Sequence, residues 1–239
     1  MAAIGQAFFS IGIGMGSLIV FGSYMPKDFS IPKCSTYVIF MDTGVALLAG
    51  LAIFPLVFAY GLDPSGGPGL IFQTLPLAFG QMPGGQIFGS IFFVLLITAA
   101  LSSCLGLAEG VTNWLDEHMN IPRKIGVLWV SGTAWVLGIA SILGFSVWKD
   151  GWESLGLLYW IPSYDGLDIF DTLDTLAANN LLLIGGAMSA IFFGWLVPKA
   201  LKLEEINVSD GLFFGFWRFM IRFVIPPILI VALTMGITE

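Results

Sequence analysis

Charged side chains are scarce in this chain, and their scarcity excludes most soluble folds. Only 10 % of the 239 residues are charged, whereas 57 % are hydrophobic and the mean hydropathy is +0.92. A water-soluble domain needs more polar surface than this composition supplies. We therefore predict an all-α membrane protein that crosses the bilayer several times.

Basic residues, cysteine and histidine are also few, and each shortage excludes a class of function. Nine Lys and Arg against sixteen Asp and Glu do not make a nucleic-acid-binding face. Cys34 and Cys104 suggest neither a disulfide framework nor a metal site. His118, the single histidine, is expected to face solvent at a helix end, so a serine hydrolase has little support. We expect no enzyme, no organic cofactor and, because no charged leader follows Met1, no signal peptide.

Long apolar stretches dominate what is present. Each of six is long enough to cross about 30 Å of hydrocarbon, and they cover residues 3–25, 36–61, 86–115, 125–147, 177–198 and 215–237. Segment 62–85 is too rich in glycine and proline to span, but its apolar centre predicts a re-entrant or lid-like outer hairpin of short helices. We treat residues 1–239 as a single transmembrane domain.

The positions of the basic residues indicate the orientation in the membrane. If the first span runs from outside to inside, only Lys149 of the nine basic residues falls on an outer connection. The inner connections then hold Lys27, Lys33, Arg123, Lys124, Lys199, Lys202, Arg218 and Arg222. By the positive-inside rule we expect a multi-pass protein of the cytoplasmic membrane, in contact with membrane lipid, whose basic connections are cytoplasmic.

The first span is weakened at its centre by three alternating glycines, Gly12, Gly14 and Gly16. Each costs about 1 kcal/mol in a helix relative to alanine. Gly12 and Gly16 also fit the spacing of close helix packing, so the glycines alone leave a continuous and an opened helix both open. Their period of two, with serines beside them, favours a discontinuous helix, whose two ends could hold an ion or a zwitterion in mid-membrane.

Polar side chains in the other spans have alternative interpretations. Asp42 is either solvated at an inner helix end or turned into the bundle. Ala99, Ser102 and Ser103 share a helix face, where hydroxyls either bond to the preceding turn or offer oxygens to a hard cation. Glu109 is expected to be paired inside the bundle.

Several stretches resemble, in order along nearly the whole chain, the second half of a neurotransmitter:sodium symporter, particularly a bacterial amino-acid transporter. They are AIGQAFFSIGIGMG followed by GSY and KD, MDTGVALLAGLAIFP, GPGLIFQTLPLAF, GGQIFGSIFFVLL, ALSSCLGLAEGVTNWLDE and FDTLD. The resemblance implies six transmembrane helices that correspond to the second inverted repeat of the leucine-transporter-like fold plus one further helix, with the first helix discontinuous.

The same resemblance implies binding residues. Ser10 and Asp42 match a first sodium site, while Ala99, Ser102 and Ser103 match a second. The substrate-binding positions are Phe9, Ser10, Gly12, Met15, Ser103 and Leu107. Among these, Gly12 and Met15 replace choices common in relatives, which suggests an apolar or bulky substrate.

The chloride-equivalent and gate positions also follow from the resemblance. Gln6, Ser10 and Asp42 are chloride-equivalent, with Ala46 in place of a serine or glutamate, so Asp42 would supply the negative charge and chloride would not be required. Tyr24 and Glu117 match inner-gate positions. Asp174 matches an outer-gate acid, although Asp171 and Asp174 could instead cap the fifth span.

The function implied is sodium-coupled symport of an amino acid by alternating access, with this chain as the C-terminal half. The family's first helix supplies facing ligands of every site, so a separate N-terminal half carrying the first five helices is an expected partner. Two alternatives remain open: a non-transporting membrane fragment or split subunit, and a small channel or packing protein. The last predicts one continuous helix through Gly12, Gly14 and Gly16.

Overall fold

The structure is a computed structural model that describes residues 2–26, 28–62, 64, 69–144, 167–206 and 210–238. The regular elements in these residues are all helices. Five helical segments are long and apolar enough to cross a membrane: Ile31–Ala59, Gly85–Met119, Arg123–Gly144, Ile169–Leu196 and Leu212–Met235. The chain divides into two compact units, Thr36–Gly106 and Met1–Ser35 together with Leu107–Glu239, and each is described by itself.

The unit Thr36–Gly106 contains most of the long helix α3, a short helix formed by η1 and α5, and the first part of α6. Its elements are α3 (Ile31–Ala59), η1 (Leu70–Thr74), α5 (Leu75–Gln81) and α6 (Gly85–Met119). With 35 residues, α6 is roughly 50 Å long and exceeds the thickness of the hydrocarbon core.

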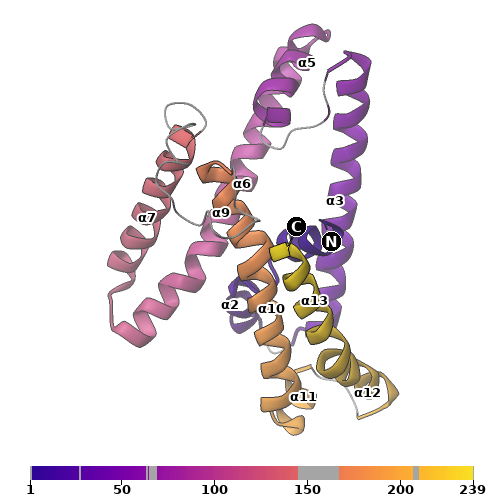
Figure 1. The fold of residues 1–239 in the computed structure, drawn as a ribbon, viewed down its shortest axis with the longest axis vertical. Coiled ribbons are helices and arrows are strands. Elements are labelled where there is room, and N and C mark those ends of the chain that lie inside the picture. Colours follow the sequence, from indigo (N-terminus) through magenta and orange to yellow (C-terminus); the bar gives the residue numbers. More distant parts are fainter. Residues whose placement is uncertain are drawn as a thin grey trace. The chain divides into compact units, whose positions relative to one another are not determined.

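The short helix α5 packs back onto the start of α6. Leu75 and Ala78 of α5 are fully buried, and the rings of Phe79 and Phe92 lie 5.6 Å apart. A Cβ on Gly89 would come within 3.2 Å of the Phe79 ring, so the absence of a side chain there lets α5 approach α6. Figure 1 shows both helices as ribbons. In the segment predicted as a hairpin of short helices, the described residues form one continuous short helix, while residues 63 and 65–68 lie outside the described residues.

In the other unit, the first span is broken into α1 (Ala2–Ile11) and α2 (Ser17–Ser23). Gly12, Gly14 and Gly16 have φ angles of 76°, 91° and 82°, a region that favours glycine. The N–H of Gly12 donates to the Phe9 carbonyl at 3.2 Å, and the N–H of Ile13 donates to the Phe8 carbonyl at 3.0 Å. These two bonds make a Schellman end for α1. The predicted discontinuous helix is confirmed, and the continuous helix required by a simple packing role is wrong.

The core of this unit lies between α10 (Leu182–Ile191) and α13 (Ile225–Thr238), which run side by side in Figure 1. Leu183, Leu229 and Ala232 are buried there, and Phe8 of α1 packs against them. Apolar side chains at helical spacing on both elements explain this contact, since each presents a stripe to the other. The core thereby anchors the first half of the broken helix.

The broken segment itself touches α10 through backbone atoms. A Cβ on Gly14 would lie within 2.5 Å of the Leu182 carbonyl oxygen, and one on Gly185 would meet the Gly14 carbonyl oxygen equally closely. No side chain fits between the backbone of the broken segment and that of α10. Glycine is needed at Gly14 for both its φ angle and this approach.

The remaining helices complete the unit. They are α7 (Arg123–Gly144), α9 (Ile169–Thr175), η3 (Leu176–Leu181), η4 (Phe192–Leu196), α11 (Lys199–Ile206), α12 (Leu212–Phe219) and η5 (Met220–Val224). The π-helical segments η3 and η4 continue α9 and α10 as one span, and η5 joins α12 to α13.

The fifth span starts earlier than the predicted residue 177, at Ile169. Asp168 caps it, because its Oδ1 accepts the backbone N–H of Asp171 at 2.8 Å. Asp171 therefore lies in the first turn and Asp174 is exposed in the second, so the interpretation of these two acids as caps is wrong. The cap lay one helical turn upstream, at a residue that the apolar run did not include.

Candidate functional site

Three of the predicted binding residues share one face of α1. Phe8 points into the core, where its Cε1 would lie 2.6 Å from a Cβ on Gly186. Gln6, Phe9 and Ser10, at i, i+3 and i+4, are exposed instead, and Phe9 keeps 45 % of its surface. The structure thus gathers Gln6, Phe9 and Ser10 on one exposed face of α1.

Gly12 and Met15 lie next to that face, in the broken segment. Both are half-buried, and the Met15 sulfur would be 3.9 Å from a Cβ on Gly12. The last carbonyl groups of α1 form the negative end of a helix, a position that stabilises cations. Ser10 therefore lies beside the negative end of α1, which attracts a cation such as sodium.

The residues expected at the second sodium site lie on α6, in the unit Thr36–Gly106. The Ser102 hydroxyl donates to the Ala99 carbonyl at 2.8 Å, so the back-bonding interpretation of this serine is confirmed. Ala99, Ser102 and Ser103 are all exposed. A cation could use both oxygens of the Ala99–Ser102 pair if the hydroxyl proton turned aside, because the hydroxyl lone pairs are still free to coordinate.

The predicted site residues belong to both compact units. Asp42 is half-buried on α3 and lies in the unit Thr36–Gly106, as do Ala99, Ser102 and Ser103. Leu107 is 47 % exposed and belongs to the other unit, as does Ser10. The structure therefore places the predicted α1 residues close to one another in one unit and the predicted residues Ala99, Ser102 and Ser103 of α6 close to one another in the other unit.

A polar network links α2, α6 and α7. The Tyr24 hydroxyl donates to Glu109 Oε1 at 2.8 Å and accepts from Asn113 Nδ2 at 2.7 Å. Arg123 Nη2 donates to both carboxylate oxygens of Glu109 at 2.6 Å, and its Nη1 donates to Asn113 Oδ1 at 3.3 Å. The expected pairing of Glu109 is confirmed, with Arg123 as its partner.

The network forms because α6 and α7 are joined by a very short turn. Asn120 has a φ of 52° after the end of α6, and Pro122 precedes the start of α7 at Arg123. A turn of this length folds α7 back so that Arg123 reaches residues about three turns earlier on α6. Opposite charges on either side of a short helical connection were the sequence signal that could have identified Arg123 as the partner of Glu109 in advance, whereas the neutral Asn113 left no such signal.

Of the predicted inner-gate residues, Tyr24 lies in this network and Glu117 is exposed two turns further along α6. The side chain of Arg123 remains 54 % exposed and that of Glu109 21 %. Because both side chains are partly exposed, salt can screen this ion pair and a conformational change can break it.

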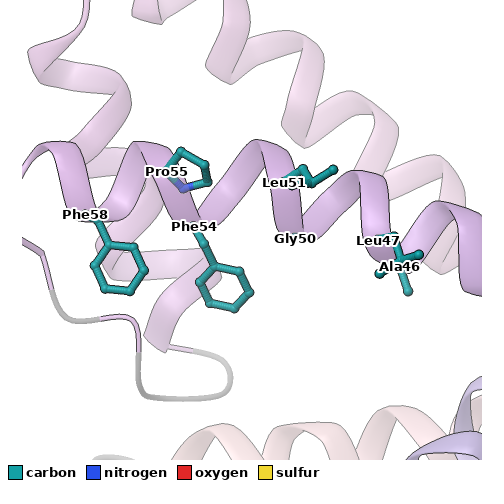
Figure 2. A pocket seen from close by; sticks show the side chains of 7 residues that line it. All are labelled: Ala46, Leu47, Gly50, Leu51, Phe54, Pro55 and Phe58. Carbon is teal, nitrogen blue, oxygen red and sulfur yellow. The ribbon is translucent and has the colours of Figure 1, made fainter.

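Ala46, which the resemblance aligns with a chloride-equivalent position, faces apolar surroundings. Figure 2 shows the shallow depression on α3 that it lines together with Leu47, Gly50, Leu51, Phe54, Pro55 and Phe58. None of these side chains carries a polar atom. The depression offers an anion nothing to bind.

Comparison with known proteins places the whole chain in one family. The model of the sodium:neurotransmitter symporter family matches residues 1–239. A sodium-dependent transporter of Haemophilus influenzae is 33 % identical over 229 residues, covering 95 % of this chain and 48 % of the relative. The sodium-dependent transporter YhdH of Bacillus subtilis is 32 % identical, covering 96 % of this chain and 49 % of the relative.

A solved structure gives the same result for the fold. The crystal structure of MhsT in complex with L-phenylalanine superposes with a TM-score of 0.86 and is 39 % identical, covering 98 % of this chain and 51 % of MhsT. The chain therefore spans about half the length of the relatives it matches.

Proposed function

Because the chain belongs to the sodium:neurotransmitter symporter family, we propose that it forms the C-terminal half of a transporter that carries an amino acid with sodium across the cytoplasmic membrane. Alternating access between two conformations would drive the cycle, with sodium binding favouring one of them. The family consists of multi-pass transporters and not enzymes, so no covalent chemistry is needed.

The observation that carries the proposal is the break in the first span. Gly12, Gly14 and Gly16 interrupt the helix between α1 and α2, and Ser10 stands exposed beside the negative end of α1. A broken membrane helix of this kind exposes peptide groups at bilayer depth, where they replace the hydration of a small ion. In the proposed fold, α1 and α2 together form the first of six crossings, ahead of the five long spans. The six correspond to the second inverted repeat and one further helix.

The proposed substrate is an apolar or bulky amino acid. The relative MhsT was crystallised with L-phenylalanine, and this chain is 39 % identical to it. On this chain the substrate would contact Phe9, Ser10, Gly12, Met15, Ser103 and Leu107. Exposure of Phe9 and Leu107 supplies apolar surface for such a side chain.

Two sodium ions would bind as co-substrates. Ser10 and Asp42 would hold one, and the oxygens of Ala99, Ser102 and Ser103 would hold the other, which suits a hard cation. Chloride would not be required, because Asp42 carries a negative charge and Ala46 lines an apolar surface. Tyr24 and Glu117 would act at the inner gate and Asp174 at the outer gate.

The face of α1 with Gln6, Phe9 and Ser10 is exposed, and the chain covers only 51 % of MhsT. We therefore propose that an N-terminal half, carrying five helices, completes each site. The alternative, a membrane fragment that does not transport, predicts no uptake whether or not that half is supplied.

Sodium-dependent uptake in vesicles tests the proposal. A panel of amino acids is offered to vesicles that hold this chain alone or with an N-terminal half, in sodium chloride and in sodium gluconate. We expect uptake of apolar amino acids with both halves present, equal in the two sodium salts. Uptake that depends steeply on chloride would contradict the proposed role of Asp42, and no uptake with both halves would favour the inert fragment.

Matched serine variants locate the ions. Ser10→Ala and Ser103→Ala should each raise the sodium concentration for half-maximal uptake about tenfold or more, because each loses a ligand to a charged ion. Ser23→Ala and Ser90→Ala serve as controls, since these hydroxyls bond to the carbonyls of Val20 and Gln86 in the preceding turn. Equal effects of the control and test variants would refute the assigned sites.

A further inference from the structure

Three cations gather where the last two spans approach each other, and we call Lys202, Arg218 and Arg222 the basic cluster. Lys202 Nζ donates to the Gly194 carbonyl oxygen at 3.1 Å. Arg222 Nε donates to the same oxygen at 2.5 Å. Because two charged donors share one acceptor, their charges are close neighbours.

The basic cluster is partly removed from solvent, with Lys202 buried and Arg218 and Arg222 half-buried. Lys202 is only 4 % exposed, and Nε of Arg218 is buried without a hydrogen-bond partner. Burial, together with Arg222 and Arg218 nearby, lowers the pKa of Lys202 from its ordinary 10.5. Buried cations are costly unless an anion faces them, so the basic cluster needs a partner of opposite charge.

The described part of the chain does not supply that partner. Its ion pairs are Arg123 with Glu109 and Lys199 with Asp210, and neither includes the basic cluster. Glu204 and Glu205 of α11 are exposed. The Gly194 carbonyl lies at the end of η4, and a helix end contributes only about half a negative charge against three cations.

The surroundings of the basic cluster are apolar and aromatic. The Arg222 guanidinium lies 5.3 Å from the centre of the Trp195 ring, and Trp195 in turn lies 5.5 Å from Phe223. Phe219 is 5.7 Å from Phe223, and all three rings are about half exposed. Exposed rings at the ends of membrane spans contact lipid, and the positive-inside distribution places this end at the cytoplasmic surface.

We propose that the basic cluster binds the phosphate of an anionic phospholipid of the cytoplasmic leaflet, whose acyl chains lie against Trp195, Phe219 and Phe223. A phosphate offers several acceptor oxygens to Arg and Lys donors, and basic sites between membrane helices on the cytoplasmic side suit such headgroups. Apolar rings beside the cations favour a lipid over a free anion. This inference does not depend on transport.

Native mass spectrometry tests the proposal on the chain released from micelles that contain equal amounts of phosphatidylglycerol and phosphatidylcholine. We expect the chain to retain phosphatidylglycerol preferentially. Lys202→Met and Arg218→Gln should each reduce that preference about fivefold, the effect of one basic residue near an anionic surface. Lys199→Met is the matched control, because Lys199 lies on the same helix but is exposed and paired with Asp210. It should leave the preference unchanged.

Several results would overturn the proposal. They are equal retention of the two lipids, an equal loss in Lys199→Met and Lys202→Met, and displacement of the lipid by inorganic phosphate at moderate concentration. Loss of the preference when an N-terminal half is supplied would assign the counter-charge to a carboxylate of that half. If Lys202→Met does not fold, Arg218→Gln decides, because Arg218 Nε has no hydrogen bond to lose.

Discussion

Alanine substitution at two of the three glycines in the broken segment distinguishes an opened helix from an intact one, because the free energy of unfolding should change in opposite directions in the two cases. In a continuous helix, Gly14→Ala and Gly16→Ala would each stabilise the protein by about 1 kcal/mol. In the observed structure both residues have positive φ angles, 91° and 82°. An alanine at such an angle costs about 1–2 kcal/mol, so both variants should be destabilised.

The two glycines differ in the space around them, which separates conformational strain from packing. A Cβ on Gly16 would meet no atom within 4 Å. A Cβ on Gly14 would meet the Leu182 oxygen and, at 2.8 Å, the Gly186 nitrogen, both of which are backbone atoms that cannot rotate away. Overpacking of this kind costs about 1–3 kcal/mol more. We therefore expect Gly16→Ala to lose about 1–2 kcal/mol and Gly14→Ala about 2–5 kcal/mol.

Titration with sodium dodecyl sulfate in mixed micelles, followed by circular dichroism, measures both losses. The original chain and Gly22→Ala, which lies inside α2 with open space around it, are the references. Stabilisation by both substitutions would refute the broken helix. Equal destabilisation by the two would refute the contact between the broken segment and α10.

Other contacts give shorter tests. Gly186→Ala should lower the free energy of unfolding by about 1–3 kcal/mol, because the new methyl group would meet the Phe8 ring. The loss should be smaller in a Phe8→Leu background, and strictly additive effects of the two substitutions would contradict that contact. A double-mutant cycle of Glu109→Gln and Arg123→Gln should show a favourable coupling that weakens as salt rises, since the pair is partly exposed; no coupling at low salt would exclude the ion pair. Tyr24→Phe should lower stability by about 1 kcal/mol by removing the bonds to Glu109 and Asn113, and an unchanged unfolding midpoint would show that the hydroxyl is dispensable.

Much of the fold follows from local properties of the chain. Apolar length alone identified the five long spans, although the second and fifth begin earlier than predicted, at Ile31 and Ile169. Helix starts depend on capping and on the first turn, where Pro32 is tolerated and Asp168 accepts a backbone N–H. An apolar pattern does not mark these polar positions, which is why the boundaries were the weakest part of the prediction.

The candidate site was predictable only in part for a related reason. Three glycines at a period of two were enough to predict the break, because helix propensity is a property of each residue. The resemblance named Tyr24 as a gate residue, but its contacts with Glu109 and Asn113 depend on how α2 and α6 pack. Contacts between residues far apart in the sequence are set by packing and leave no local pattern.

The sequence by itself therefore determined that this chain is an α-helical membrane protein, where its spans lie and where the first one opens, since these depend on composition and on single-residue conformational energies. The tertiary structure alone decided that Gly14 touches α10 while Gly16 touches nothing, that Arg123 is the partner of Glu109, and that Lys202 is buried. Each of these contacts joins segments that packing brings together, and burial or pairing contributes to the free energy only once those segments are in contact.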